Sequence, residues 1–140
     1  MRQVIQECQK GISKADNPFA AILVDQNGKI IVKAHNSQVS QNDRTAHAEV
    51  VLVRKACRKL KAFYLNGYSV FVISEPCSMC SSLLIKAKVD AIYYGARLDN
   101  GNDPVIHVEE VVQKAKHKPK IYGGILETDC EALISSIRKV

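Results

Sequence analysis

The chain has 140 residues, of which 46% are hydrophobic and 24% are charged, and its net charge is +6. This length fits one domain that can bury a core without disulfides, and no apolar run reaches the roughly 18 residues that a membrane-spanning helix needs. The polar first residues lack the apolar centre of a signal peptide, so we expect a cytoplasmic protein of one domain, residues 1–140, without a membrane partner.

The first part of the chain predicts a helix followed by a hairpin. Apolar residues at helical spacing indicate a helix over residues 4–12, and Asn17-Pro18 breaks that pattern. Two short apolar runs follow, at residues 19–25 and 30–35. The stretch Gln26-Asn27-Gly28 between them is typical of a hairpin turn, so we expect two antiparallel strands.

The rest of the chain alternates between helical and strand patterns. We expect helices over residues 46–63, 77–88, 105–116 and 128–139, the last with Thr128 as its N-cap, and strands over residues 68–74, 89–95 and 119–124. Strands that are linked through helices favour parallel pairing. The predicted fold class is therefore α/β, a three-layer α/β/α sandwich around a central five-stranded mixed sheet.

Two of the five cysteines stand three residues apart in the stretch EPCSMC. An odd number of cysteines without an export signal argues against a disulfide framework and favours thiols or metal ligands. Cys77 and Cys80 fall on the first turn of a predicted helix, where they can face one ion and where the helix N-terminus favours the thiolate form. A redox pair or simple core packing would use the same spacing, so these alternatives stay open.

His47 and Glu49 offer what a catalytic zinc site would still need. Such a site has three protein ligands and an open position for water. His47 starts a predicted helix and can hold the ion, while Glu49 can stay unligated and take a proton from the bound water. Alone, each would be an ordinary first-turn residue. Together with Cys77 and Cys80 they form the H-x-E…P-C-x-x-C signature of zinc deaminases.

With these residues the sequence resembles the cytidine deaminase-like superfamily of zinc-dependent deaminases. The matching stretches, in the family's order, are NPFAAILVD, AHN, NDRTAHAEV, EPCSMC and AIYYGAR. The resemblance implies a single zinc-dependent deaminase domain with one Zn²⁺ per chain, held by His47, Cys77 and Cys80. It also implies a hydrolysis in which zinc-bound hydroxide attacks the ring carbon that bears an exocyclic amine, with Glu49 as the proton shuttle.

The same resemblance implies a set of substrate-binding residues. They are Phe19, Ala20, Asn36, Ala48, Glu75 and Asp99. Asn36 matches an asparagine that binds the ring or sugar in these relatives, and Asp99 matches a loop aspartate that would bind the exocyclic groups of a purine. Without the resemblance, Asn36 and Asp99 would be ordinary turn residues, and Phe19 and Ala20 would be plain core.

The branch of the superfamily decides the substrate. NPFAAILV and NDRTAHAE look most like the guanine and nucleoside deaminases, so we expect a free nucleobase or nucleoside as the substrate, a guanine-type purine. The alternative is a tRNA-specific adenosine deaminase that converts adenosine to inosine at the wobble position. The closing stretch GGILETDCEALI and the positive net charge favour this alternative. A cytosine or cytidine deaminase is the third option.

Two basic clusters would serve a tRNA partner. They consist of Arg54, Lys55, Arg58, Lys59 and Lys61, and of Lys114, Lys116, Lys118 and Lys120. A solvated amphipathic helix shows the same pattern. The resemblance also implies a homodimer. Two further hypotheses are a zinc-holding module without activity, against which the intact Glu49 speaks, and a redox protein, which bound zinc would exclude.

Overall fold

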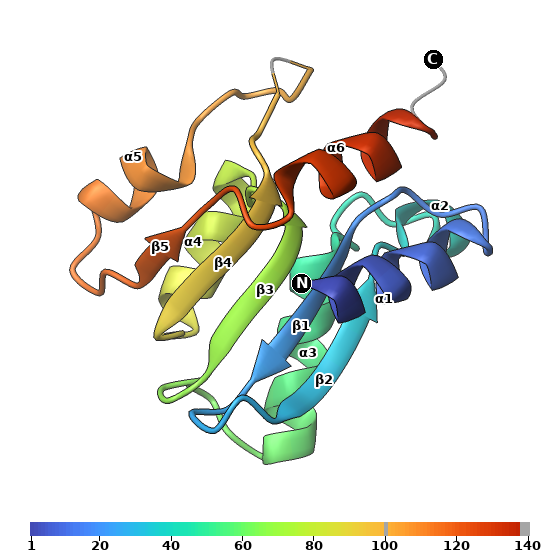
Figure 1. Cartoon of the computed structure of the whole chain (residues 1–140). Coiled ribbons are helices and arrows are strands. Elements are labelled where there is room, and N and C mark those ends of the chain that lie inside the picture. The colour runs from blue at the N-terminus through green and yellow to red at the C-terminus, as the bar shows by residue number, and fades with distance from the viewer. Residues whose placement is uncertain (100, 138–140) are drawn as a thin grey trace.

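The computed structural model describes residues 1–99 and 101–137, which fold around one five-stranded sheet (Figure 1). The strands are β1 (Ala20–Val24), β2 (Ile30–His35), β3 (Ser69–Ser74), β4 (Ala91–Ala96) and β5 (Lys120–Tyr122). They lie in the order β2-β1-β3-β4-β5. β1 pairs antiparallel with β2 and β3, whereas β3, β4 and β5 pair in parallel. The expected mixed sheet is confirmed.

Helices cover both faces of this sheet and complete the expected three layers. They are α1 (Arg2–Ile12), α2 (Gln38–Gln41), α3 (Ala48–Leu60), α4 (Ser78–Lys86), α5 (Val108–Gln113) and α6 (Glu127–Ser135). α1 and α6 lie on one face, α3 and α4 lie on the other, and α5 packs on α4 (Figure 1). None of the helices in the described parts of the chain is both long and apolar enough to cross a membrane.

Alternating residues of β1 separate the interior into two cores. Ala21 and Leu23 belong to the core under α3 and α4, whereas Ala20 and Ile22 belong to the core under α1 and α6. Successive side chains of a strand point to opposite faces of the sheet. A strand with helices on both faces therefore needs apolar residues at every position, which explains the unbroken run AAILV in β1.

Two predicted helix starts are wrong, each for a local reason, and the predicted end of the last helix at residue 139 lies outside the described residues. α5 is shorter than the predicted 105–116, because His107 is its N-cap and the backbone N–H of His107 donates to Glu110 at 2.7 Å. Thr128 is not the N-cap of α6. Leu126 takes that position in a left-handed conformation with φ of 50°, so Thr128 lies in the first turn of the helix.

The short helix α2 between β2 and α3 was not predicted. Its residues are polar or exposed, and contacts with distant parts of the chain hold it. The backbone N–H of Ser40 donates to the carboxylate of Asp16 at 2.9 Å. Asn42 ends the helix in the left-handed region, with φ of 48°. This small helix brings the chain back to the start of α3.

Candidate active site

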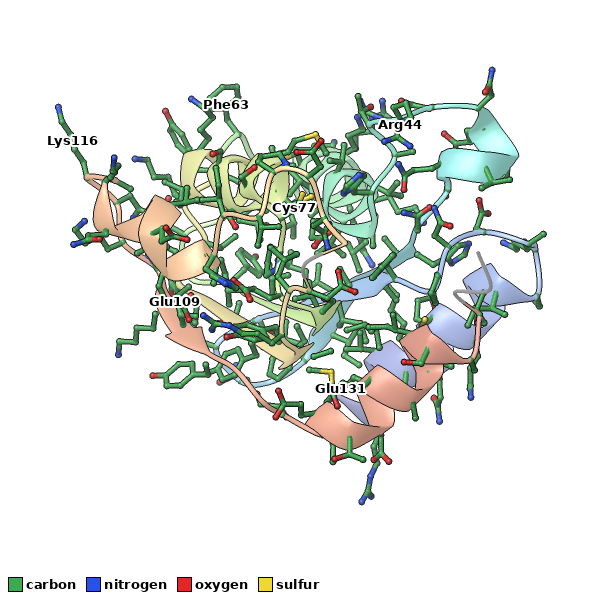
Figure 2. The ribbon with its side chains drawn as sticks, turned by 90° about the horizontal axis from the view of Figure 1, so that it is seen from above. Arg44, Phe63, Cys77, Glu109, Lys116 and Glu131 are labelled. Carbon is green, nitrogen blue, oxygen red and sulfur yellow. The ribbon has the colours of Figure 1, made fainter. Side chains whose placement is uncertain are left out.

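The starts of α3 and α4 carry the three predicted metal ligands. His47 is the N-cap of α3, Cys77 is the N-cap of α4, and Cys80 follows on the first turn of α4 with no exposed surface. The Nδ1 atom of His47 lies 3.7 Å from Sγ of Cys77 and 3.6 Å from Sγ of Cys80. All three ligand atoms lie within 4.8 Å of one another. Cys77 is labelled in Figure 2, near the middle of the molecule in that view.

These separations fit a zinc ion. Tetrahedral zinc with a Zn–S bond of about 2.3 Å and a Zn–N bond of about 2.0–2.1 Å requires a sulfur–nitrogen separation of about 3.6 Å. The two observed separations, 3.7 and 3.6 Å, match this value. A set of two thiolates and one imidazole favours zinc over harder cations. Among the residues that the structure describes, no other group of three could hold a metal ion in this way.

The loop before α3 is held by its own hydrogen bonds. The carboxylate of Asp43 accepts from the backbone N–H and from the hydroxyl of Thr45, both at 2.8 Å. These bonds lower the pKa of Asp43. The carbonyl of Ala46 accepts from the N–H of Ser37 at 3.0 Å, which ties the loop to the segment after β2. The tight turn places His47 at the start of the helix.

The electrostatics of this centre suit a metal ion and a proton carrier. A hydrogen bond from Cys80 lowers the pKa of Cys77 to about 4 despite burial, which favours the thiolate form of Cys77. The same bond keeps the second proton on Cys80, and metal binding to thiolates releases such protons. Burial raises the pKa of Glu49, and the negative charge of Cys77 raises it further. A carboxyl group with a raised pKa holds a proton more readily, as a proton carrier must.

A cavity of about 240 Å³ lies beside the metal ligands. Its lining includes His47, Glu49, Cys77 and five of the six predicted substrate-binding residues, namely Phe19, Ala20, Asn36, Ala48 and Glu75. Small-molecule pockets usually measure about 300–1,000 Å³, so this cavity suits one flat ring rather than a large ligand. The sixth residue, Asp99, lies at a neighbouring cavity, where its carboxylate accepts from the N–H of Gly101 at 3.0 Å.

A network of amides fixes the side chain of Asn36, which is almost fully buried. Its Nδ2 donates to the side chain of Gln38 at 2.8 Å, and its Oδ1 accepts from the backbone N–H of Gln38 at 2.9 Å. Gln38 also accepts from Asn17 at 3.2 Å and donates to the carbonyl of Arg44 at 3.0 Å. Three separate segments of the cavity wall, around residues 17, 36–38 and 44, are therefore held together. Whether Asn36 binds a substrate stays a prediction.

Glu75 turns its carboxylate toward the loop between β4 and α5. The carboxylate accepts from the N–H of Leu98 at 3.0 Å and from the N–H of Val108 at 2.8 Å. Nδ1 of His107 lies 3.1 Å away and Nε of Arg97 lies 3.3 Å away. The Glu75 side chain has no exposed surface. Glu75 therefore holds both ends of the loop beside the cavity, and a direct contact between its carboxylate and a substrate stays a prediction.

Several residues of the cavity were not predicted. They are Asn17, Pro18, Gln38, Arg44, Val72, Ser74, Leu98 and Asn102. Asn17, Pro18 and Arg44 lie inside the stretches NPFAAILVD and NDRTAHAEV, so the resemblance was a usable signal for these three. Gln38 belongs to the polar segment after β2, which gave no motif. Leu98 and Asn102 belong to the loop that Glu75 holds.

Comparisons with known proteins support the same chemistry. Residues 1–96 match the family model described as the cytidine and deoxycytidylate deaminase zinc-binding region. A tRNA-specific adenosine deaminase of Aquifex aeolicus is 33% identical, and the match covers 100% of this chain and 93% of that protein. Other curated relatives with the same name are 30% identical over most of this chain. A solved structure from a study of tRNA:A34 deaminases at the wobble position is 30% identical, with a TM-score of 0.86, and the match covers 95% of this chain and 96% of that chain.

These matches confirm the expected superfamily, fold and zinc chemistry, but they contradict the expected substrate. The prediction of a free base or nucleoside of guanine type as the substrate is wrong, because the curated relatives that match over the whole chain are named tRNA-specific adenosine deaminases. A guanine deaminase structure from Nitrosomonas europaea has a TM-score of 0.87, covering 97% of this chain and 81% of that chain, but at 23% identity it shows the fold alone. The stretches NPFAAILV and NDRTAHAE misled because they contribute His47 and part of the cavity wall, and these residues do not by themselves distinguish a free base from a base in a tRNA.

Proposed function

This chain belongs to the cytidine and deoxycytidylate deaminase family of zinc-dependent hydrolases, and on that basis we propose that it converts adenosine to inosine in a transfer RNA, at the wobble position. The likeness over the full length carries this proposal, since relatives of the same extent are named for that activity. We take residues 1–140 as one deaminase domain, because both cores pack on the same sheet.

In this proposal, His47, Cys77 and Cys80 hold one Zn²⁺ through Nδ1 and the two Sγ atoms. When bound, the ion supplies a Lewis acid that lowers the pKa of water to about 7. Three properties of the ligands support the role. Their separations match tetrahedral zinc, the lowered pKa of Cys77 favours its thiolate form, and Cys80 has no exposed surface. Of these ligands, His47 and Cys77 also line the cavity, so the ion would be held beside it.

Glu49 moves the protons. Deamination replaces the bond between the ring carbon and the exocyclic nitrogen with a bond to oxygen, and the nitrogen leaves as ammonia. The carboxylate of Glu49 takes a proton from the attacking water and gives it to the ring nitrogen beside the reacting carbon. It then takes the proton of the new hydroxyl group and gives it to the amine that leaves. Burial, which raises the pKa of Glu49, supports this role because both transfers need a carboxyl group that binds protons well.

The cavity holds a base and leaves the rest of the RNA outside. At about 240 Å³ it suits one flat ring, so the target nucleotide has to leave its stack before it can react. Single-stranded loops supply such bases more readily than duplexes do, which agrees with an anticodon loop as the target. Asn36 would hold an edge of the base, and Phe19, Ala20 and Ala48 would contact its faces. The exposed Arg44 would lie beside the neighbouring phosphates.

Ammonia release on a substrate panel tests the proposal. The zinc-loaded protein is incubated with a tRNA transcript that has adenosine at the wobble position, with free adenosine, with guanine and with cytidine. We expect ammonia from the tRNA alone. Glu49→Gln is the matched control, since it keeps the metal ligands and removes the proton carrier. Ammonia from free guanine or free adenosine at a comparable rate would contradict the proposal.

The homodimer that the resemblance implies stays a prediction. One chain has a mass of 15.5 kDa, so light scattering at micromolar concentration distinguishes one chain from two. We expect the mass of two chains. A single chain that deaminates tRNA at full rate would show that no second copy is needed.

A further inference from the structure

The solvent side of α3 has only one sign of charge. Every exposed residue of this helix is a cation, namely Arg54, Lys55, Arg58 and Lys59, and Lys61 follows at the C-cap. The opposite side contains Leu52, Val53 and Ala56, which are buried in the core. Helical spacing of three and four residues separates the two sides, as in any amphipathic helix. The exposed side differs from a mixed surface in that no exposed carboxylate of the helix stands among its cations.

Carboxylates do little to neutralise these cations. The sole acidic residue in the sequence of α3 is Glu49, which is buried at the cavity. Among the described residues, Arg54 alone of these five has a carboxylate oxygen within 4.0 Å, and the distance from Arg54 to Asp43 is 4.0 Å. We call the five cations of residues 54–61, together with Lys33 of the neighbouring strand, the α3 ridge.

Two lysines of the α3 ridge are held over the edge of the sheet. β2 is an outer strand of the sheet, and the Nζ of Lys59 donates to the carbonyl of Ile31 at 2.8 Å. The Nζ of Lys55 lies 3.5 Å from the carbonyl of Lys33. A shallow groove runs between β2 and α3, lined by Ile31, Val32, Lys33, Lys55, Arg58 and Lys59. Carbonyl groups position the ammonium groups but leave their charge uncompensated.

The α3 ridge continues from the candidate active site. α3 begins directly after His47, and a rise of about 1.5 Å per residue puts Lys59 about 18 Å farther along the helix. The exposed Arg44 lines the cavity and precedes α3 by four residues, so it adds one cation at the cavity end of this path. Figure 2 shows Arg44 and Phe63, which precede and follow α3 in the sequence, at the same edge of the molecule.

We propose that the α3 ridge binds the phosphate backbone of the RNA outside the nucleotides that enter the cavity. This inference rests on the proposed function, which brings an RNA to the adjoining cavity. A backbone that leaves the cavity past Arg44 meets cations at successive turns of the helix, and a row of fixed cations attracts a chain of phosphates whatever its base sequence. A second copy of this chain fits less well, because its net charge is also +6 and two such chains repel each other.

Two variants with equal changes in charge test the proposal. The ridge variant is Lys55→Gln, Arg58→Gln and Lys59→Gln. The control variant is Lys114→Gln, Lys116→Gln and Lys120→Gln, which removes three exposed cations of the second basic cluster. That cluster lies near α5 and β5, at the opposite edge of the sheet from β2, so a backbone that follows the α3 ridge does not reach it. Lys118 is left intact, because it donates to the last carbonyls of α5 at 2.7 and 2.8 Å. Both variants have the same net charge, so a nonspecific charge effect would change them equally.

The measurement is the dissociation constant for a tRNA transcript as a function of salt concentration. Each phosphate contact contributes about 0.7–0.9 to the slope of log Kd against log salt, so we expect the ridge variant to lose about 2–3 from that slope. The control variant should keep the slope of the parent. Equal slopes and equal Kd values for the ridge and control variants would overturn the α3 ridge proposal.

A second ridge variant separates binding from folding. Lys33→Gln with Arg58→Gln removes two cations without removing either lysine bond to β2. Its slope of log Kd against log salt should be lower than that of the parent by about 1.4–1.8. Its urea unfolding midpoint should equal that of the parent. An unchanged slope would also overturn the proposal. Deamination by the parent is measured in parallel. If the parent binds and deaminates tRNA but all variants have the same salt slope as the parent, the ridge proposal alone is refuted. A parent that neither binds nor deaminates tRNA refutes the proposed function and the ridge with it.

Discussion

Replacing Glu75 with alanine tests the assignment of this carboxylate to the loop between β4 and α5. In the structure, Glu75 accepts from the backbone N–H of Leu98 and from the backbone N–H of Val108, at 3.0 and 2.8 Å. Both residues are buried, with 6% and 0% of their surface exposed. In Glu75→Ala neither N–H has its acceptor, and water has little access to replace it. The loop beside the cavity loses the anchor at both of its ends.

The magnitude follows from these two donors. A buried donor without a partner costs about 1–3 kcal/mol, so two of them cost about 2–6 kcal/mol of unfolding free energy. We leave Arg97 out of this sum, because it keeps a second carboxylate partner, Glu109 at 2.9 Å. For a chain of about this size each kcal/mol lowers Tm by about 2–4 °C, so even the low end lowers Tm by about 4–8 °C.

Urea unfolding of the zinc-loaded protein measures this loss. Glu131→Ala is the matched control, because it removes an exposed carboxylate from the middle of α6. Hydrogen exchange at the amides of Leu98 and Val108 gives a local reading, and both should exchange faster in Glu75→Ala alone. If Glu75→Ala were as stable as Glu131→Ala to within about 0.5 kcal/mol, the expected size of a surface substitution, the anchoring role would be refuted.

Two further predictions concern stability against pH and metal content. Burial alone would raise the pKa of Glu7, but hydrogen bonds from His35 and Lys10 lower it overall, so the charged carboxylate stabilises the fold above its ordinary pKa of about 4.3. Glu7→Gln should therefore lower the unfolding free energy by about 1.5–3 kcal/mol at pH 7, and this loss should shrink as the pH falls below about 4. Urea titrations that give equal losses at pH 7 and at pH 3 would contradict this prediction. Cys80→Ser should purify with far less than one zinc per chain. The control Cys8→Ser changes a buried thiol outside the metal centre and should keep one zinc. Equal zinc contents in the two variants would contradict the ligand assignment.

The sequence predicted those parts of the molecule that depend on local patterns. The hairpin of β1 and β2 followed from a turn at Gly28, which has φ of 79° in the structure. His47 and Cys77 were placed at helix starts from the periodicity of the residues after them, and the structure has both as N-caps. The five-stranded mixed sheet followed from the alternation of helices and strands.

The remaining parts depend on contacts between distant residues. Glu75 matched a family motif, but its partners at residues 97–108 lie 22 to 33 positions later, and no local pattern points to them. Gln38 lies in a helix of four residues, too short to show a period. The substrate was missed for another reason. The residues around His47 and Cys77 lie at the metal ligands and the cavity, so they carry little information on what part of a substrate lies outside the cavity.

Inosine formation at the wobble position is the most direct test of the central claim. A tRNA transcript with adenosine at that position is incubated with the zinc-loaded protein or with Glu49→Gln, and the nucleosides are quantified by mass spectrometry after digestion. We expect one inosine per tRNA with the parent and none with Glu49→Gln, although both proteins contain one zinc per chain. Adenosine that stays intact with the zinc-loaded parent, or inosine that forms equally fast with Glu49→Gln, would contradict the proposed function.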